Sequence, residues 1–417
     1  MSSTEPASQS QASATSGTAH ATNFTGNFTQ QEGLPEEAIA AAVALMQSGR
    51  LHRYNTAAGE TSEAALLEQE FAAYLGVDHC LACTSGGYAL AVAMRAWGVT
   101  PGTAVLTNAF TLSPVPGAIA NCGGKPVLVE TTADLVLDLD HLEQCIRDSG
   151  ARLLLLSHMR GNIVDMERLC QVLDRHGVAL IEDCAHTMGA SWNGRKSGTF
   201  GVAACFSTQT YKHMNSGEGG LLTSNDAGLI ARATLMSGSY MLYQRHGTPP
   251  PEQAFEAAKW QMPNMSGRMD NLRAAILRPQ LRLLDENCQR WNQRYHAWRA
   301  MMVSHPRVVL PARPETEQFV ASSAQFSVAS LSPEQPPLLV SAAMQRGVEL
   351  KWFGGAEPHG FTSRFDSWHY IEPQDLPGTH DVLSRLFDLR LPLTFSLQQC
   401  EQLGQIICEC VDELAII

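Results

Sequence analysis

The sequence predicts an α/β fold, in which a mostly parallel, doubly wound sheet carries helices on both faces and a smaller α+β domain follows. Two observations support this prediction. Short apolar runs alternate with segments of helical spacing between residues 80 and 225, which is typical of consecutive βαβ units. After about residue 305 the alternation stops, and short strands stand between separate helices. The 417 residues, 44% of them hydrophobic, suffice for a large core.

The N-terminal region divides into a tail and two helices. Residues 1–32 are rich in Ser, Thr, Ala, Gln and Gly and have few large apolar side chains. Such a composition cannot bury enough surface to offset the entropy of ordering, so we expect a disordered tail. Apolar spacing then predicts one helix that starts at Pro35 and ends near Gly49, and a second over 63–74 that stops at Gly76. A large ligand-binding domain is expected to span 33–270.

The alternating elements of the large domain follow in order. Apolar runs predict strands at 80–83, 104–106, 126–129, 153–157, 178–182 and 221–223. Helical spacing predicts helices at 88–97, 116–120, 139–147, 166–176 and 226–236, whereas 238–267 is polar and Pro-rich. The C-terminal part, 271–417, is expected to begin with one long connecting helix over 272–295. A small α+β domain follows, with strands within 318–328 and helices at 335–346 and 396–415.

Composition excludes several classes of function. The net charge is −12 and there is no block of basic residues, which argues against nucleic acid and anionic membrane surfaces as partners. No apolar run approaches the length of a membrane span. The N-terminus has no basic region followed by an apolar one, so no signal peptide is expected and a cytoplasmic location is predicted.

The cysteines indicate packing rather than cross-linking. Eleven cysteines are scattered through the expected core elements, and an odd number of this kind favours free thiols in a reducing compartment. Cys80 and Cys83 have the spacing of a zinc motif, but no second such pair or nearby pair of histidines accompanies them. Cys408 and Cys410 are likewise isolated. No metal site is expected.

The strongest functional signal joins an acid to a lysine. A buried strand ends in Glu182 and Asp183, at the edge where open α/β sheets bind ligands. Lys212 follows about thirty residues later, in a loop that continues into Gly217-Glu218-Gly219-Gly220. Lysine and acid together are the minimum that pyridoxal 5′-phosphate (PLP) requires: the lysine forms a Schiff base and the acid pairs with the pyridinium nitrogen. A structural aspartate and a surface lysine would give the same pattern.

A second signal is the segment Thr84-Ser85-Gly86-Gly87 between a strand and a helix. Helix N-termini offer unpaired N–H groups, and glycines allow close approach, so the segment suits a phosphate group. An ordinary helix cap by Ser85 is the alternative. The dinucleotide fingerprint GxGxxG is absent here, which favours a monophosphate. Phe110 could stack on a planar cofactor or belong to the core. Ser207 could donate to the phosphate or cap a turn.

These residues resemble the DegT/DnrJ/EryC1/StrS aminotransferases, which are PLP enzymes of the aspartate-aminotransferase fold (fold type I) best known for aminating nucleotide-linked keto-sugars. The resemblance covers about residues 35–290 well and the remainder weakly. It rests on Leu75-Gly76-Val77, Thr84-Ser85-Gly86, Ala89-Leu90, Pro101-Gly102, Phe110-Thr111, Gly161, Asp165-Met166, Glu182-Asp183-Cys184-Ala185-His186, Gly189-Ala190, Gly198, Gly201, Phe206-Ser207, Lys212, Gly217-Glu218-Gly219-Gly220, Arg268-Met269 and Ala274-Ala275.

The resemblance implies roles for these positions. Lys212 would form the Schiff base and move protons, Asp183 would keep the pyridine nitrogen protonated, and His186 would lie near the ring. Phe110 would stack on the ring, and Ser85, Gly86 and Ser207 would hold the phosphate. The full set of expected cofactor contacts is Ser85, Gly86, Gly87, Phe110, Asp183, His186, Ser207, Lys212, and Asn264 or Ser266. The resemblance also implies a homodimer with active sites shared across the interface.

Three departures from the family pattern bear on the substrate and the dimer. Gly87 stands where the family usually has Thr. Ser266 stands where an Asn usually reaches the partner's phosphate, and Asn264 lies two residues earlier, so either could serve. Arg160 replaces an aromatic residue and could bind an anion or be an ordinary surface residue. The segment 351–359 lacks the family's His-Tyr-x-Pro-Leu-His pattern, and its Lys351 and Trp352 are candidate substrate contacts.

The sequence therefore predicts a PLP-dependent aminotransferase for small molecules. An amino acid donor, glutamate or glutamine, would supply the amino group. A keto or aldehyde acceptor such as a keto-sugar, a cyclitol or a specialised metabolite would receive it. The alternative is a fold type I enzyme of a biosynthetic pathway that performs elimination, decarboxylation or carbon–carbon bond chemistry, because the cofactor supports all of these.

Overall fold

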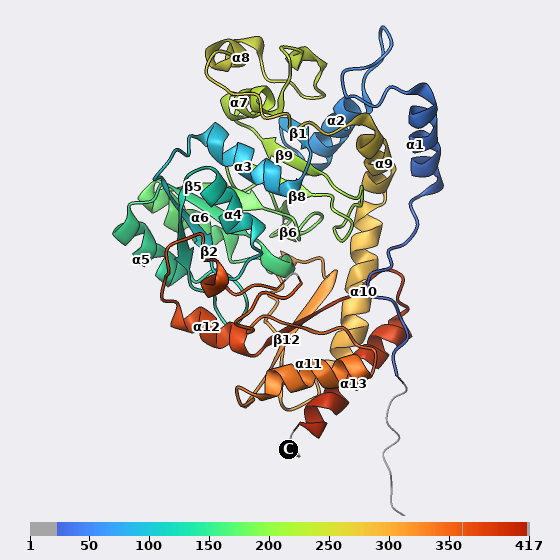
Figure 1. Ribbon diagram of the computed structural model, residues 1–417, viewed down its shortest axis with the longest axis vertical. Helices are drawn as coiled ribbons and strands as arrows, with labels where there is room; N and C mark the ends of the chain where they lie inside the picture. The colour runs from blue at the N-terminus through green and yellow to red at the C-terminus, as the bar shows by residue number, and fades with distance from the viewer. Residues whose placement is uncertain (1–22, 361, 415–417) are drawn as a thin grey trace, which may run out of the picture.

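The computed structural model describes residues 23–360 and 362–414, and within these ranges a seven-stranded sheet forms the centre of the large domain (Figure 1). The strand pairs from β3 to β8 are parallel, and β9 runs antiparallel to both β8 and β1. The predicted mostly parallel α/β fold is confirmed. In spatial order the strands are β1 (His79–Cys83), β9 (Gly220–Ser224), β8 (Ala203–Ser207), β5 (Ala179–Asp183), β4 (Leu153–Ser157), β2 (Ala104–Asn108) and β3 (Lys125–Val129).

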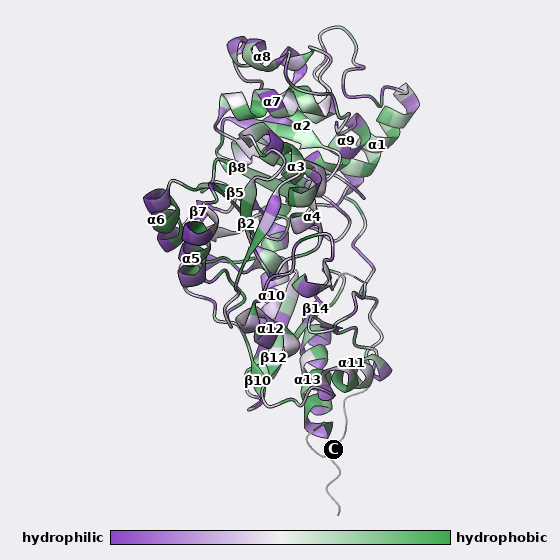
Figure 2. Ribbon diagram, turned by 60° about the vertical axis from the view of Figure 1, so that its left-hand side comes forward, coloured by the Kyte–Doolittle hydropathy of each residue, from purple (hydrophilic) through white to green (hydrophobic). Residues whose placement is uncertain are grey.

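Helices cover both faces of this sheet. One face packs against α2 (Glu63–Leu75), α5 (Leu139–Ser149), α6 (Met166–His176) and α9 (Asn271–Arg282), and the other against α3 (Gly86–Trp97), α4 (Pro114–Asn121) and α7 (Ala227–Ser237). Because side chains of a strand alternate between faces, Leu154 and Leu156 enter the first core and Leu153 and Leu155 the second. Purple and green residues run along α5 and α6, as expected of helices with one solvent-facing side (Figure 2).

Side-chain caps fix where several of these helices begin. Asp138, Asp165 and Asp226 precede α5, α6 and α7, and each carboxylate accepts hydrogen bonds from backbone N–H groups of the first turn. These N–H groups have no partner inside the helix, so a capping oxygen stabilises the start. These caps therefore set the first turn of each helix directly after the loop that precedes it.

The smaller C-terminal domain is built on the four-stranded antiparallel sheet β10-β12-β14-β13. Its core contains Trp298, Phe326 and Phe387, all without exposed surface. The helix α10 runs down one side of the molecule and carries the chain from the large domain into this one (Figure 1). The elements are α10 (Leu284–Met302), β10 (Val308–Val309), β12 (Ser323–Val328), α11 (Gln335–Gln345), β13 (Lys351–Trp352), α12 (Pro377–Ser384), β14 (Leu386–Arg390) and α13 (Leu397–Glu413).

The remaining elements are short or peripheral. Helix α1 (Glu36–Ser48) packs against α9, and α8 (Glu252–Ala258) packs against α7. A three-stranded sheet joins β11 (Glu317–Gln318), β6 (Ser191–Trp192) and β7 (Arg195–Lys196). Single 3₁₀ turns are η1 (Met159–Gly161), η2 (Tyr243–Arg245) and η3 (Phe365–Ser367). Among the described helices, none combines the length and the apolar composition that crossing a membrane requires.

The prediction of a single long helix over 272–295 is wrong. The chain forms two helices, α9 and α10, which meet at Leu283. There the Leu283 N–H bonds to Gln280 O, a tighter i−3 bond that ends the first helix. Helix α9 packs against α1 and α2, whereas α10 packs against α13. The first turns of α10 still share the core of the large domain with α9, and its later turns enter the C-terminal core. Elements at 252–258, 351–352, 377–384 and 386–390 were not expected, because their apolar runs are short.

The disordered tail predicted for 1–32 needs correction over its last ten residues, and residues 1–22 lie outside the described ranges. Phe24 and Phe28 are buried in the C-terminal core, each 5.0 Å from the ring of Phe395. The Phe24 N–H donates to Arg346 O at 2.9 Å. Two phenylalanines supply enough buried apolar area to order a segment whose average composition is polar.

Candidate active site

A cavity of about 430 Å³ lies at the carboxyl ends of the central strands. The residues that line it come from the first turn of α3, from the ends of β4, β5 and β8, from the loop after β8, and from the C-terminal domain. The sequence-predicted residues that line it are Ser85, Gly86, Gly87, Arg160, Asp183, His186, Ser207 and Lys212. The structure therefore brings the phosphate loop, the acid and the lysine to one cavity.

The predicted phosphate loop forms the N-terminus of α3. The Ser85 hydroxyl caps the helix by accepting from the Tyr88 N–H at 3.1 Å. The backbone is tightly packed here: a Cβ on Gly86 would lie 2.8 Å from Ser207 Cβ, and one on Gly220 would lie 2.4 Å from the Ser85 backbone. Gly87 has open space on its Cα. Helix N–H groups, two serines and this open side form a cradle that suits a phosphate.

Asp183 ends β5 and presents its carboxylate to the cavity. It is only 7% exposed, and it accepts hydrogen bonds from Ser157 Oγ at 3.0 Å and from the Ala185 N–H at 3.1 Å. Burial raises the pKa of Asp183, although Lys212 and these hydrogen bonds act in the opposite direction. A buried carboxylate gains most from a cationic partner. The protonated ring nitrogen of PLP would be such a partner.

Lys212 and His186 form a close pair in the cavity, with 2.9 Å between Lys212 Nζ and His186 Nε2. Burial lowers the pKa of Lys212 to about 8, Asp183 opposes this, and Arg160 adds to it. Burial and the lysine also lower the pKa of His186 well below its usual range, so the imidazole is neutral. Its Nδ1 accepts from the Arg160 N–H at 3.3 Å. Nε2 is therefore the ring nitrogen that faces the Lys212 amine.

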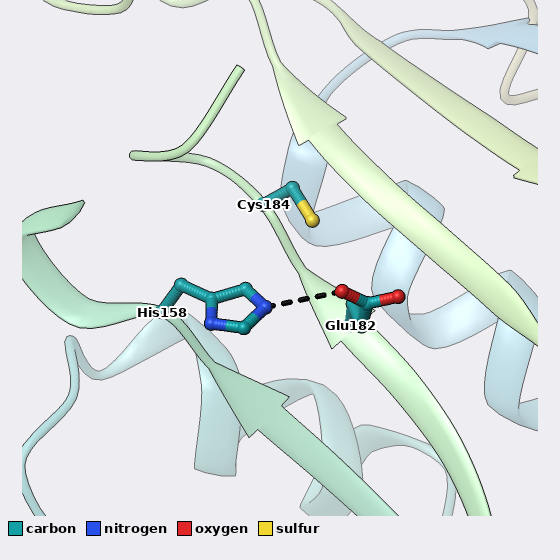
Figure 3. A group of neighbouring side chains, drawn as sticks. All are labelled: His158, Glu182 and Cys184. Atoms are coloured by element: carbon teal, nitrogen blue, oxygen red, sulfur yellow. Dashed lines mark hydrogen bonds and ion pairs between the residues drawn. The ribbon is translucent and has the colours of Figure 1, made fainter. Parts of the chain in front are cut away.

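Glu182, next to Asp183, faces away from this cavity and belongs to a buried group with His158 and Cys184 (Figure 3). Its carboxylate accepts from the N–H groups of Gly198, Phe200 and Gly201 at 2.7–2.9 Å and from His158 Nε2 at 3.2 Å. The Cys184 thiol contacts Ser197 Oγ, and burial raises its pKa well above the usual value. Protein groups thus satisfy the carboxylate, which fastens residues 198–201 to β5.

Two of the predicted contacts lie elsewhere. Phe110 is 1% exposed and does not line the cavity; it packs edge-on against Phe353, 5.1 Å away, so its predicted stacking on the cofactor is corrected. Leu112, two residues later, lines the cavity instead. The Trp352 indole donates to Ser384 O at 2.7 Å and also lies outside the cavity wall, so its predicted substrate contact is corrected as well.

The other predicted contacts have a different status. Lys351 is not a lining residue, but its charge acts on His186 at the cavity. Asn264 and Ser266 are exposed and do not line the cavity of their own chain, and the Ser266 N–H and hydroxyl both donate to Asn264 Oδ1. Their expected role concerns a partner subunit, so it stays a prediction.

Several lining residues escaped the sequence reasoning. Ser157 ends β4 directly beside Asp183 in the parallel register, so strand adjacency could have indicated it. Tyr211 immediately precedes the lysine. Arg390 ends β14 and Gln31 belongs to the N-terminal segment, and both reach the cavity only through the tertiary fold. Nothing local in the sequence marks these last two.

The chain is similar in sequence to known aminotransferases and to a sugar-modifying enzyme. The chain is 33% identical to a GDP-perosamine synthase of Caulobacter vibrioides over 253 residues, which are 59% of this chain and 65% of that protein. It is 31% identical to an L-glutamine:2-deoxy-scyllo-inosose aminotransferase of Streptomyces kanamyceticus over 242 residues, 58% of this chain and 56% of that protein. The chain thus spans less than two thirds of the length of these relatives.

A solved structure and a family profile extend the comparison to nearly the whole chain. The crystal structure of 3-amino-5-hydroxybenzoic acid synthase has the same fold, with a TM-score of 0.80 and 24% identity over 94% of this chain and 100% of that one. The profile of a family whose aminotransferases are in general PLP-dependent matches residues 34–409. The resemblance noted in the sequence is therefore confirmed, and the chain belongs to the DegT/DnrJ/EryC1/StrS aminotransferase family.

Proposed function

We propose that this protein is a PLP-dependent aminotransferase that moves an amino group from an amino acid donor, glutamate or glutamine, to a keto or aldehyde acceptor. One observation carries the proposal: a lysine with a lowered pKa, a buried carboxylate and a helix N-terminus with two serines line the same cavity. The relatives' names, a GDP-perosamine synthase and a scyllo-inosose aminotransferase, support a keto-sugar or a cyclitol among the acceptors.

The residues present fit PLP at both of its ends. Ser85, Gly86, Gly87 and Ser207 would hold the phosphate, and Asp183 would pair with the ring nitrogen. When bound there, PLP supplies an electron sink that stabilises negative charge on the carbon bearing the amino group. Leu112 offers an apolar contact from the cavity wall in place of Phe110.

Lys212 is suited to act as nucleophile and as proton carrier. At pH 7 about a tenth of it is uncharged, because its pKa is about 8, and an ordinary lysine has far less of the neutral form. A general base works best when its pKa lies near the working pH. His186 orients the lysine through its Nε2, and Arg160 fixes the imidazole through the backbone N–H. The lysine nitrogen is thereby held in one place inside the cavity.

A test separates transamination from other PLP chemistry. Purified protein with PLP should lose its visible absorption band when L-glutamine or L-glutamate is added and regain it with a keto acceptor. Lys212→Ala should not complete this cycle, whereas Lys196→Ala, which changes a half-buried lysine outside the cavity, should complete it. Release of ammonia or carbon dioxide without the cycle would contradict transamination and favour elimination or decarboxylation.

We further propose a homodimer with shared active sites. Large apolar side chains lie exposed on α1 and after α7, including Met46, Tyr240 and Trp260, the last with 86% of its surface exposed. Exposed apolar groups of this size are typical of protein interfaces. Asn264 and Ser266 follow Trp260 closely in the sequence and are also exposed. In the dimer they would reach the phosphate site of the partner subunit. Mixing Lys212→Ala with a double Asn264→Ala, Ser266→Ala variant should restore activity; no restoration would contradict site sharing.

A cytoplasmic location is part of this proposal. All eleven cysteines of the sequence fall within the described residues, and each is a free thiol. Free thiols in this number favour a reducing compartment.

A further inference from the structure

Two adjacent serines stand in the wall that the C-terminal domain contributes to the cavity. Ser322 directly precedes β12 and Ser323 is its first residue, and both line the cavity that holds Lys212. Neither hydroxyl has a task in the function proposed above. We call this pair the serine subsite, and its hydrogen bonds decide what kind of ligand group it can meet.

The backbone holds both serines in place. Ser323 lies in the antiparallel ladder between β12 and β14. The Leu391 N–H donates to Ser322 O at 3.0 Å, and the preceding Ala321 N–H donates to Asn292 Oδ1 at 3.0 Å. The two hydroxyl groups therefore project from a firmly hydrogen-bonded part of the C-terminal sheet.

The hydrogen bond of Ser322 fixes which way its proton points. His213 Nδ1 lies 2.8 Å from Met188 O, and because a carbonyl oxygen can only accept, Nδ1 carries a proton. Burial lowers the pKa of His213 to about 4, so near neutral pH the other ring nitrogen, Nε2, has none. Nε2 lies 3.2 Å from Ser322 Oγ, so the serine donates its only proton to this nitrogen. Towards the cavity, the Ser322 hydroxyl can only accept.

Ser323 has the opposite polarity. Gln325 Nε2 donates to Asp388 Oδ1 at 2.8 Å and to Ser323 Oγ at 2.9 Å. Because the carboxylate requires a donor, the amide nitrogen faces both groups, and Ser323 is the acceptor of the second bond. No described residue accepts the Ser323 proton, although this residue is only 5% exposed. The Ser323 hydroxyl can therefore donate to a ligand in the cavity.

Gln31 adds a third polar group, which comes from the N-terminal segment. Hydrogen bonds of its two neighbours hold this segment: the Thr394 hydroxyl donates to Gln30 O at 3.2 Å, and Arg290 Nη1 donates to Glu32 Oε2 at 2.9 Å. Gln31 lines the cavity, and its side-chain amide forms no hydrogen bond with any described residue. An amide can both donate and accept, so it can serve either end of a hydroxyl group.

Apolar side chains complete this wall. Trp291, Leu391 and Pro392 line the cavity together with the serines, and the Trp291 ring lies 5.0 Å from the ring of His213. A flat aromatic side chain suits the C–H face of a saturated ring, and a few placed polar groups suit the hydroxyls at the edge of that ring. The wall therefore combines an apolar surface with one acceptor, one donor and one amide.

We propose that the serine subsite binds neighbouring hydroxyl groups of the amino acceptor, with Ser322 accepting from one hydroxyl and Ser323 donating to the next, and with Gln31 as a further contact. The inference rests on the proposed aminotransferase function and narrows its acceptor from any keto or aldehyde compound to a hydroxyl-rich ring. An acceptor without hydroxyl groups would displace water from the buried Ser323 and leave its proton unpaired, which lowers affinity.

The first test measures binding without reaction. The probe is scyllo-inosose, a cyclohexanone with a hydroxyl group on each of its remaining carbons, titrated by calorimetry into the protein with PLP and without an amino donor. Ser322→Ala, Ser323→Ala and Gln31→Leu should each weaken its binding about three- to tenfold, as expected for the loss of one hydrogen bond between neutral groups. Ser327→Ala is the matched control, because Ser327 belongs to the same strand but does not line the cavity.

The second test shows whether the serines act on the hydroxyl groups themselves. After L-glutamine has bleached the visible band, its return is followed with scyllo-inosose and with cyclohexanone, which is the same ring without hydroxyls. At low ketone concentration, Ser322→Ala and Ser323→Ala should slow the reaction of scyllo-inosose about three- to tenfold and leave that of cyclohexanone unchanged. Equal slowing with both ketones would overturn hydroxyl recognition, because a general distortion of the cavity affects both.

The results also separate this inference from the proposed function. A wild-type protein that does not bind scyllo-inosose, or serine variants that bind it as wild type does with unchanged melting temperatures, overturn the serine subsite whatever the reaction is. A protein that binds scyllo-inosose through these serines, but whose visible band never responds to L-glutamine or L-glutamate, overturns the aminotransferase proposal instead.

Discussion

Lys212 should titrate near pH 8 in the protein freed of cofactor, far below an ordinary lysine. The pKa falls from 10.5 to about 8 because burial disfavours the ammonium form, an effect that Asp183 opposes and Arg160 and Arg390 increase. A fall of this size means that burial and the neighbouring charges disfavour the ammonium form of Lys212 by roughly 3 kcal/mol. At pH 7 it raises the neutral, nucleophilic fraction of the lysine by roughly 300-fold, to about a tenth of the molecules.

Competitive labelling measures this directly. Brief pulses of acetic anhydride at pH 6 to 11, followed by peptide mass spectrometry, give the reactivity of each of the five lysines. Lys212 should reach half of its maximal reactivity near pH 8. Lys259 is the internal control, because its ion pair with Glu256 raises its pKa. Asp183→Asn should shift the midpoint of Lys212 down, since it removes the group that raises its pKa, and Arg160→Met should shift it up. A wild-type midpoint near pH 10, or an upward shift in Asp183→Asn, would refute the reasoning.

Three further predictions concern stability and cofactor binding. Glu68→Gln should lower the free energy of unfolding in urea by about 3 to 5 kcal/mol, because it breaks a fully buried ion pair with Arg53; Glu60→Gln, at an exposed pair, should change it far less. Gly220→Ala should lower the melting temperature, because the new Cβ would collide with the backbone of the phosphate loop. Gly87→Ala should leave the melting temperature unchanged, because nothing lies near its Cα, but it should weaken PLP binding in a fluorescence titration. Phe28→Ala should lower the free energy of unfolding in urea by about 3 to 5 kcal/mol. An unchanged free energy of unfolding would mean that the N-terminal segment is not part of the core.

The large domain could be predicted because each of its signals is local. A buried strand such as 179–183 is a continuous apolar run, and helices such as α6 begin at a capping aspartate that the sequence displays. The meeting of Asp183, Lys212 and the Ser85 loop at one cavity was also predictable, because they sit next to strands whose carboxyl ends share one edge of the sheet.

The remainder depends on tertiary contacts. Phe28 is buried only because the C-terminal core comes to meet it. Leu281 and Leu284, on either side of the break at Leu283, belong to one core, so their apolar pattern does not mark the break. Phe110 and Leu112 stand two residues apart after the same strand, and only the loop conformation decides which one faces the cavity. Arg390 lies nearly 180 residues beyond Lys212, so no spacing rule could join them.

The central claim is that Lys212 carries the cofactor. Its most direct test is borohydride reduction of the purified protein with PLP, followed by peptide mapping of the labelled lysine. Lys351 makes the test demanding, because its pKa is also about 8 and its charge acts on His186. We predict a visible absorption band before reduction and the phosphopyridoxyl group on Lys212 alone after it. A protein that binds no PLP, or that carries the label on Lys351 or another lysine, would contradict the account.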